Sequence, residues 1–223
     1  MAHVLIITPC HNHGHVVHET IRSAIGQTYP HWRMVIVDDG SEWEDSRRLH
    51  RAVCALDDPR VIECYPWRPG EALGSAWARN LAALHGGPSD WIVPLDADDM
   101  LVPTHLERML AGVGDADWAY CDLELFGDQV GVIRAPDDAQ ATVREVNRFT
   151  HGGSLLSREM FDALGGYRLS LRFSEDWDLF VRADGAGFRS VHVPEVLYRY
   201  RRHQGSKMRT GPTLEERAKA VLG

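Results

Sequence analysis

The sequence predicts an α/β protein: a single Rossmann-like domain in which helices flank a mostly parallel central sheet, with a small antiparallel addition in the C-terminal half. Three observations predict it. Short aliphatic runs alternate with amphipathic stretches through the first hundred residues, acidic residues directly follow two of those runs, and residues 118–125 alternate partly with period two. Short strands separated by helices favour parallel pairing through right-handed crossovers.

The first half contains strand and helix patterns in alternation. Aliphatic runs bounded by turn residues predict strands at residues 4–8, 34–37, 60–65 and 91–95. Apolar residues at helical spacing predict helices at residues 15–27, 45–56 and 71–85. Each helix lies between two strands, as a parallel sheet requires.

The second half is more mixed. Residues 118–125 and 130–134 are expected to pair as a hairpin around Gly127 and Asp128. The remaining patterns predict helices at residues 157–164 and 175–183, an extended segment at 191–200 and a charged helix after Pro212. Because no linker rich in Pro, Gly or Ser interrupts the chain, we expect one domain over residues 1–223.

Composition narrows the classes of protein. The 223 residues carry 32 acidic and 24 basic side chains, a net charge of −8 without long blocks, which does not indicate a nucleic-acid partner. No apolar run reaches the roughly 18 residues of a membrane-spanning helix, so no transmembrane segment is expected. The four cysteines lie far apart, which predicts reduced thiols in a cytoplasmic protein. A homodimer remains open.

The acidic cluster Asp96, Asp98 and Asp99 directly follows the apolar run at residues 91–94. Open α/β sheets bind ligands at the carboxyl ends of their strands. Clustered carboxylates repel each other, and oxygen ligands favour Mg²⁺ or Mn²⁺ held together with substrate phosphates. The first hypothesis is therefore a metal–diphosphate site. A solvated acidic loop, or a helix start with Pro103 in its first turn, is the alternative.

Other motifs are weaker. The cluster of His11, His13, His15 and His18 resembles a zinc site only loosely, because its spacing across a loop and a helix start is irregular, so we do not expect zinc there. The chain has neither a Gly-x-Gly-x-x-Gly fingerprint nor a P-loop, which disfavours a nicotinamide cofactor and a P-loop nucleotide site.

Eight motifs in order resemble the family 2 glycosyltransferases of the GT-A fold, over residues 4 to 206. Each is short, but their order and spacing together are specific. The motifs are at residues 7–12, 27–30, 37–41, 78–80, 95–99, 165–167, 174–179 and 198–203. The resemblance implies a nucleotide-binding half at residues 1–100, an acceptor-binding and catalytic half at 101–206 and a tail helix at 207–223.

The resemblance implies that the loops after the first two strands hold the nucleotide base. Here these residues are Pro9, His11, Asn12 and Asp39. A carboxylate such as Asp39 can accept the imide N–H of uracil, a donor that cytosine lacks. His11 replaces the commoner Tyr of the family but keeps a planar ring. UDP is therefore the favoured nucleotide, with dTDP and GDP as alternatives.

The resemblance also implies the diphosphate and metal site. Arg79 is expected near the diphosphate, since a guanidinium suits phosphate oxygens. The family pattern places Asp96 near the donor ribose and Asp98 on a Mn²⁺ or Mg²⁺ ion. Asp99 is expected to assist the metal or to cap the following helix.

His203 matches a C-terminal histidine that contacts the metal or diphosphate in many relatives, and a neutral imidazole is a feasible Mn²⁺ ligand. It lies in a basic segment with Arg199, Arg201, Arg202 and Lys207. A mobile basic tail of this kind can close over a diphosphate. A surface histidine without a metal is the alternative interpretation.

The catalytic residue expected from the resemblance is Asp176, the general base that deprotonates the acceptor hydroxyl in a single, inverting displacement. Glu175 precedes it and is expected at the substrate, and Ser174 with these acids also fits a helix N-terminus. Trp177 and Trp77, beside motif residues, are the candidates for stacking on a sugar.

The sequence therefore predicts a metal-dependent inverting glycosyltransferase that moves a sugar from a nucleoside-diphosphate sugar to an acceptor hydroxyl. Variable loops, here at residues 124–153, would bind the acceptor, whose identity the sequence does not give. A sugar-1-phosphate nucleotidyltransferase is one alternative, although residues 8–12 are not a Gly-rich basic loop. A non-catalytic nucleotide-sugar binding module is another, although it would not need the acids at 175–176.

Overall fold

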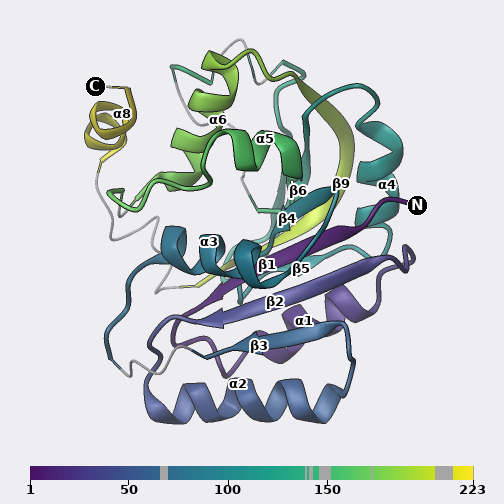
Figure 1. The fold of residues 1–223 in the computed structure, drawn as a ribbon, viewed down its shortest axis with the longest axis vertical. Helices are drawn as coiled ribbons and strands as arrows, with labels where there is room; N and C mark the ends of the chain where they lie inside the picture. Colours follow the sequence, from purple (N-terminus) through teal and green to yellow (C-terminus); the bar gives the residue numbers. More distant parts are fainter. Residues whose placement is uncertain are drawn as a thin grey trace.

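The computed structural model describes residues 1–65, 70–138, 140, 143–145, 152–171, 173–203 and 213–222. Within these residues nine strands form one sheet, in the order β3-β2-β1-β4-β8-β6-β9-β5 with β7 paired to β6 (Figure 1). The strands are β1 (Val4–Cys10), β2 (Trp32–Asp38), β3 (Val61–Cys64), β4 (Trp91–Pro94), β5 (Met100–Leu101), β6 (Trp118–Gly127), β7 (Gly131–Ile133), β8 (Leu155–Ser157) and β9 (Ser190–Arg202).

Most of the sheet runs in one direction. Strands β3, β2, β1 and β4 pair in parallel, and the two long strands β6 and β9 pair in parallel with each other. Strand β8 lies between β4 and β6 and is antiparallel to both, so β6 runs the same way as β4. The short strands β5 and β7 add antiparallel pairs. The predicted sheet and its small antiparallel addition are confirmed.

Helices cover both faces of this sheet (Figure 1). One hydrophobic cluster joins the sheet to the first, second and fourth helices, and another joins it to the rest. The helices are α1 (Val17–Ile25), α2 (Trp43–Leu56), α3 (Ser75–His85), α4 (His105–Gly112), α5 (Arg158–Ala163), α6 (Glu175–Gly185) and α8 (Leu214–Leu222).

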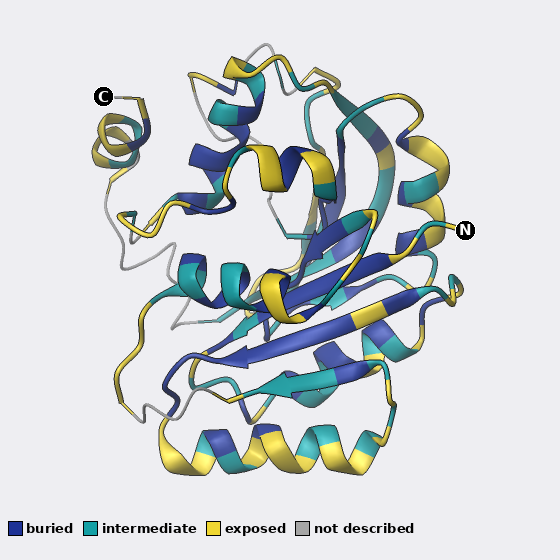
Figure 2. Ribbon diagram, viewed as in Figure 1, coloured by how far each residue is buried: buried dark blue, intermediate teal, exposed yellow. Residues whose placement is uncertain are grey.

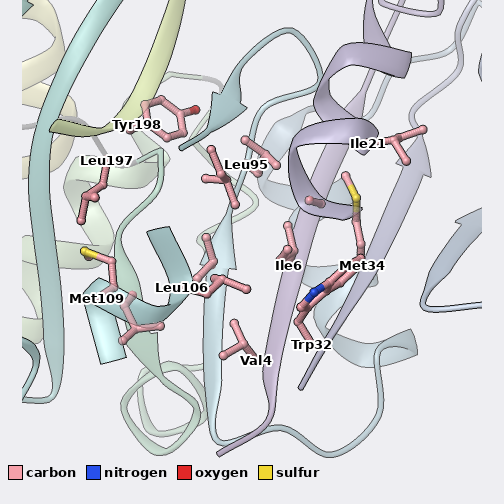
Figure 3. Close-up of a cluster of buried hydrophobic side chains, with 14 of the residues drawn as sticks. Val4, Ile6, Ile21, Trp32, Met34, Leu95, Leu106, Met109, Leu197 and Tyr198 are labelled. Carbon is pink, nitrogen blue, oxygen red and sulfur yellow. The ribbon is translucent and has the colours of Figure 1, made fainter. Parts of the chain in front are cut away.

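The aliphatic strand β1 shows why the sheet needs continuous apolar runs. Val4 and Ile6 point into the first cluster, which Figure 3 shows, and Leu5 and Ile7 point into the second. Successive strand residues face opposite sides, so a strand covered on both faces is almost entirely apolar, and in β1 the buried polar exception is Thr8. Figure 2 shows the result: the central strands are buried, and exposed residues lie on the outer faces of the helices.

Several element boundaries differ from the sequence prediction. The third helix begins at Ser75 rather than at residue 71, because Gly74 has φ 106°, outside the helical region. Strands β5 and β8 were not among the predicted elements, whereas α4 is the helix expected after the acidic cluster. The predicted hairpin is present as β6 and β7. All four cysteines are free thiols, and no described helix is long and apolar enough to cross a membrane.

Candidate active site

The candidate site lies where β1, β2 and β4 end at one edge of the sheet. Cys10 pairs with Asp38 and Ile7 with Pro94, so the loops that follow these strands start side by side. These loops carry residues 11–14, 39–41 and 95–99. Parallel topology alone therefore brings together three of the segments that the sequence singles out.

The first two loops are joined by hydrogen bonds. The ring Nδ1 of His11 lies 2.8 Å from the carbonyl oxygen of Asp39. The backbone amide of Asn12 donates to Ser41 Oγ at 2.9 Å, and its side-chain oxygen accepts from the amide of Glu42 at 2.8 Å. Asn12 has φ 57°, a left-handed conformation that Asn tolerates better than most residues. Pro9 precedes this loop within β1, so the four predicted base-binding residues are neighbours.

Asp39 also fixes the segment that leads into α3. Its two carboxylate oxygens accept the backbone amides of Leu73 and Gly74, each at 2.8 Å. The side chain is buried, so these bonds replace its hydration. Each carboxylate oxygen has a second lone pair, which leaves acceptor capacity toward a base.

Arg79 of α3 lies between two acids. Its Nη2 donates to Asp96 Oδ1 at 2.6 Å and its Nη1 to Glu175 Oε1 at 2.7 Å. The guanidinium side chain is only 7 % exposed, and the Ser75 hydroxyl donates to the same Glu175 oxygen. Both terminal nitrogens thus contact carboxylates rather than presenting an open fork for a diphosphate. Arg79 joins the loop after β4 to the start of α6.

Asp98 lies between two histidines from distant parts of the chain. His203 Nε2 is 3.1 Å from Asp98 Oδ2, and His13 Nδ1 is 3.9 Å from Asp98 Oδ1. The donor atoms of these three residues all lie within 4.8 Å of one another. Burial lowers the pKa of His13, against the opposing effect of the Asp98 and Asp96 charges. A carboxylate and two imidazoles form a donor set that a divalent transition metal accepts.

Asp99 is hydrogen-bonded to strand β9. Its carboxylate accepts the Tyr198 hydroxyl at 2.6 Å and the Arg201 amide at 2.7 Å, both from β9. Burial, followed by the charges of Asp98 and Asp96, holds the pKa of Asp99 well above its usual value. It does not cap α4, whose N-cap residue is Thr104. Asp99 therefore attaches the acidic loop to β9 and so to the segment that ends at His203.

Within the described residues, the arginines of the basic segment belong to strand β9 rather than to a free tail. Arg199 and Arg201 lie within β9 and pair with Glu124 at 2.7 Å and Glu19 at 3.0 Å. Arg201 also donates from Nε to the carbonyl oxygen of Asp98 at 2.7 Å. The expected mobile tail over a diphosphate is wrong for these two arginines, because each is held by an acid. Lys207 lies outside the described residues.

Asp176 occupies the first turn of α6, beside the Arg79 ion pairs. One of its oxygens accepts the backbone amide of Trp177 at 2.8 Å, and within the described residues the other oxygen has no hydrogen-bond partner. Burial, then the neighbouring charge of Glu175, raises the pKa of Asp176 to about 6, while Arg79 and the Trp177 amide oppose the rise. Ser174 has φ 60° and makes no side-chain cap, so this turn is not a Ser-capped helix start.

The structure contradicts the interpretation of Trp177 as a residue that stacks on a sugar. The side chain is 1 % exposed, and its indole N–H donates to the carbonyl oxygen of Val143 at 2.5 Å. It packs in the second hydrophobic cluster and has no free face for a sugar. Trp77 is half-buried and packs against the same cluster. The helical turn that points Asp176 outward points Trp177 into the core.

The chain matches a known protein family over most of its length. Residues 5–176 match the family model described as glycosyl transferase family 2. The chain belongs to glycosyl transferase family 2. The match begins in β1 and ends at Asp176, so it spans all the loops described above except the one that carries His203.

Curated relatives of this glycosyltransferase are distant. It is 25 % identical over 209 residues to the putative glycosyltransferase EpsE of Bacillus subtilis, covering 89 % of this chain and 72 % of the relative. Over 202 residues it is 27 % identical to the succinoglycan biosynthesis protein ExoA of Rhizobium meliloti, covering 83 % of this chain and 59 % of the relative. It spans 58 % of the uncharacterized glycosyltransferase RP339 of Rickettsia prowazekii. The chain thus covers less than two thirds of several relatives.

Solved structures share the fold. Residues 1–349 of TarS from S. aureus, in complex with UDP-GlcNAc, superpose with TM-score 0.75 at 15 % identity, covering 95 % of this glycosyltransferase and 62 % of that chain. The mannosyltransferase PcManGT from Pyrobaculum calidifontis, in complex with GDP-Man and Mn²⁺, gives TM-score 0.70 at 19 % identity, covering 99 % and 68 %. The GT-A fold expected from the sequence is confirmed.

One site residue, His13, was not predicted to contribute to the site. His13 belongs to the irregular histidine cluster, yet it lies beside Asp98 and His203, 85 and 190 positions away in the chain. No spacing rule could have found it, because the contact depends on which loops meet at the sheet edge.

Proposed function

We propose that this glycosyltransferase moves a sugar from a nucleoside-diphosphate sugar, with UDP favoured, to an acceptor hydroxyl by a metal-dependent inverting displacement. The observation that carries the proposal is the arrangement at one sheet edge of a metal-ligating group at Asp98 and a carboxylate with a raised pKa at Asp176. Arg79 connects their neighbours Asp96 and Glu175. Inverting transfer needs one base and one charge stabiliser, and both kinds of group are present.

The donor set at Asp98 and His203 fits a divalent cation. An oxygen and an imidazole nitrogen suit Mn²⁺ well and Mg²⁺ less well, since Mg²⁺ prefers oxygen ligands. A bound cation would offset the negative charge that develops on the departing diphosphate. The complex of PcManGT contains GDP-Man with Mn²⁺, and that of GalNAc-T7 contains UDP, GalNAc and Mn²⁺, which supports the same class of cofactor here.

Asp176 is the proposed general base. The Asp176 oxygen without a hydrogen-bond partner among the described residues would take the proton of the acceptor hydroxyl. The hydroxyl oxygen would at the same time attack the anomeric carbon, and the bond from that carbon to the diphosphate would break. A pKa near 6 leaves the carboxylate largely ionised at neutral pH yet more basic than an ordinary Asp, which suits a general base. Glu175, held by Arg79 and Ser75, positions this turn and keeps a negative charge beside Asp176.

The loop residues Pro9, His11, Asn12 and Asp39 are proposed to bind the base. The TarS complexes contain UDP and UDP-GlcNAc, whereas PcManGT binds GDP-Man, so the fold accommodates both bases. The remaining lone pairs of the Asp39 carboxylate favour a base with an imide donor.

The acceptor would approach from the side of residues 124–153, part of which lies outside the described residues. The four free cysteines fit a reducing compartment such as the cytoplasm.

A screen of nucleotide sugars with Mn²⁺ tests the proposal. Wild-type protein should hydrolyse or transfer from at least one UDP-sugar, and Asp176→Asn should retain donor binding while losing turnover. Binding without turnover by the wild type would favour the non-catalytic binding module. Release of diphosphate from a nucleoside triphosphate and a sugar 1-phosphate would favour the nucleotidyltransferase. An α-linked product from an α-linked donor would refute the inverting displacement.

A further inference from the structure

His13 stands on the side of Asp98 opposite His203. The two imidazoles approach different oxygens of the same carboxylate, at 3.9 Å for His13 Nδ1 and 3.1 Å for His203 Nε2. Their rings lie edge to face with centroids 6.0 Å apart. We propose that His13 is a third protein ligand of the metal, which makes the site a two-imidazole, one-carboxylate centre selective for Mn²⁺-like ions over Mg²⁺. This inference rests on the proposed metal-dependent transfer.

The spacing of the donor atoms fits one ion. Bonds from a transition metal to nitrogen or oxygen are about 2.1 Å, so two ligands of one ion lie about 3 to 4 Å apart. The two imidazole–carboxylate distances, one to each Asp98 oxygen, fall in that range. All three donor atoms lie within 4.8 Å of one another, against the about 4.2 Å that two ligands on opposite sides of one ion span, so a small inward movement of the side chains completes the site.

No hydrogen bond explains where the His13 ring lies. Its Nδ1 is too far from Asp98 for one, and within the described residues the ring makes no other. The ring is about two thirds buried, and among the described residues its nitrogens have only the long ion-pair contact with Asp98. A metal ion held between His13, Asp98 and His203 would supply a partner.

The backbone holds His13 in place. Its carbonyl oxygen accepts the amides of Val16 and Val17, both at 3.0 Å, at the start of α1. The next residue, Gly14, packs against α2: a Cβ there would stand 2.0 Å from the Asp45 carbonyl oxygen, so only glycine fits. The ring therefore projects from a short, fixed loop, and binding a metal needs little reorganisation.

The opposite end of the site is held as firmly. Arg201 donates from Nε to the Asp98 carbonyl oxygen and from Nη2 to Glu19 of α1. The same arginine therefore connects the segment before His203, the loop of Asp98 and the helix that follows His13. All three proposed ligands are attached to one cluster of contacts.

The ligand types set the selectivity. Mn²⁺ accepts imidazole nitrogen together with oxygen ligands, less strongly than Fe²⁺, Co²⁺ or Zn²⁺, whereas Mg²⁺ prefers oxygen and keeps its waters. A second imidazole should therefore strengthen Mn²⁺ binding and leave Mg²⁺ binding nearly unchanged.

His15 offers a matched control. It lies in the same loop, but its Nδ1 faces Asp45 at 3.5 Å rather than Asp98, and its side chain is 56 % exposed. His13→Ala and His15→Ala each remove one imidazole from the same loop. An effect seen in His13→Ala but not in His15→Ala therefore cannot be a general effect of losing a loop histidine.

The experiment uses full-length protein stripped with EDTA and then titrated with MnCl₂ or MgCl₂ alone. Electron spin-echo spectroscopy of the bound Mn²⁺ detects coordinated ¹⁴N, and calorimetry gives the affinities. We expect two imidazole couplings in the wild type and in His15→Ala, and one in His13→Ala. The Mn²⁺ affinity of His13→Ala should fall by about tenfold or more, with the Mg²⁺ affinity within about twofold of wild type. Circular dichroism and melting temperature establish that both variants fold.

The outcomes separate this inference from the proposed function. Equal Mn²⁺ affinity and unchanged nitrogen coupling in His13→Ala would overturn the third ligand while leaving a site at Asp98 and His203 intact. Equal losses in His13→Ala and His15→Ala would also overturn it. Two imidazole couplings in a wild-type protein that transfers no sugar would support the ligand and refute the transferase proposal. Absence of Mn²⁺ binding by the wild type would overturn the inference.

Discussion

Asp176 makes a quantitative prediction about the pH dependence of transfer. Its pKa is raised to about 6, first by burial and then by the charge of Glu175, and a general base acts only when it is ionised. On the acidic side of the pH profile, kcat/KM should therefore rise with pH, with a midpoint at about pH 6. Asp96 adds to the raised pKa, while Arg79 and the Trp177 amide oppose it.

The size of the effect follows from the ionised fraction. With a pKa of about 6, that fraction falls from about nine tenths at pH 7 to about one tenth at pH 5, so kcat/KM should fall about tenfold. With the ordinary value of 3.8, the same acidification would remove only about 6 % of the ionised form. The two cases are easily distinguished.

The assay measures initial rates with the donor found in the nucleotide-sugar screen, at saturating Mn²⁺, between pH 4.5 and 8. Asp176→Asn should lose about 10²- to 10⁴-fold in turnover, and its residual rate should lack the limb near pH 6. Glu175→Gln should shift the limb to lower pH, because it removes the nearest negative charge. Direct measurement of bound Mn²⁺ at each pH separates loss of metal from protonation of the base.

Two results would refute the assignment. A wild-type rate that is unchanged down to pH 5 would mean that the base is not a carboxylate with a raised pKa. A limb near pH 6 that persists in Asp176→Asn would mean that another group titrates. Either result would remove Asp176 from the proposed role while leaving the family membership unaffected.

The remaining predictions concern the metal, the base and the ion pairs. Asp98→Ala should abolish transfer and Mn²⁺-dependent nucleotide binding but leave the melting temperature close to wild type, because it removes one of several repelling acids; full wild-type activity in EDTA would contradict it. UDP or dTDP should raise the melting temperature more than CDP at equal concentration, and equal shifts would remove Asp39 from base recognition. Arg79→Ala should lower the free energy of unfolding by about 3 kcal/mol in urea denaturation, because it leaves the buried Glu175 carboxylate without its cation. A smaller loss than that of a surface arginine such as Arg47→Ala would show that the ion pairs are energetically unimportant.

The sequence predicted the doubly covered strands well, for a physical reason. A strand buried on both faces is a nearly continuous apolar run, and the run from Val4 to Ile7 in β1 can be recognised as such a strand from the sequence. Strands β5 and β8 were not predicted because two or three residues are too few to show a period, and their pairing depends on neighbours far away in the chain.

The site residues divide in the same way. Asp98 was identified because an acid after an apolar run marks a strand end, a local signal. The proximity of His203 came only from the family resemblance, and that of His13 had no signal, since the meeting of three loops is a tertiary property. Trp177 was misassigned because adjacency to a motif says nothing about direction: successive helical residues project about 100° apart, and one turned into the core.

Four acidic residues surround one buried arginine at the site. Asp96, Asp98, Glu175 and Asp176 lie near one another, and the buried cation among them is Arg79, whose two terminal nitrogens are both occupied by acids. Asp96 is two residues from the proposed metal ligand, and Glu175 adjoins the proposed base. The same arginine thus links the proposed metal site to the proposed base, while the negative charge that adds to the effect of burial on the pKa of Asp176 also attracts a divalent cation. Because bound metal would partly neutralise that excess, metal binding should lower the pKa of Asp176, so the base and the metal site are thermodynamically coupled.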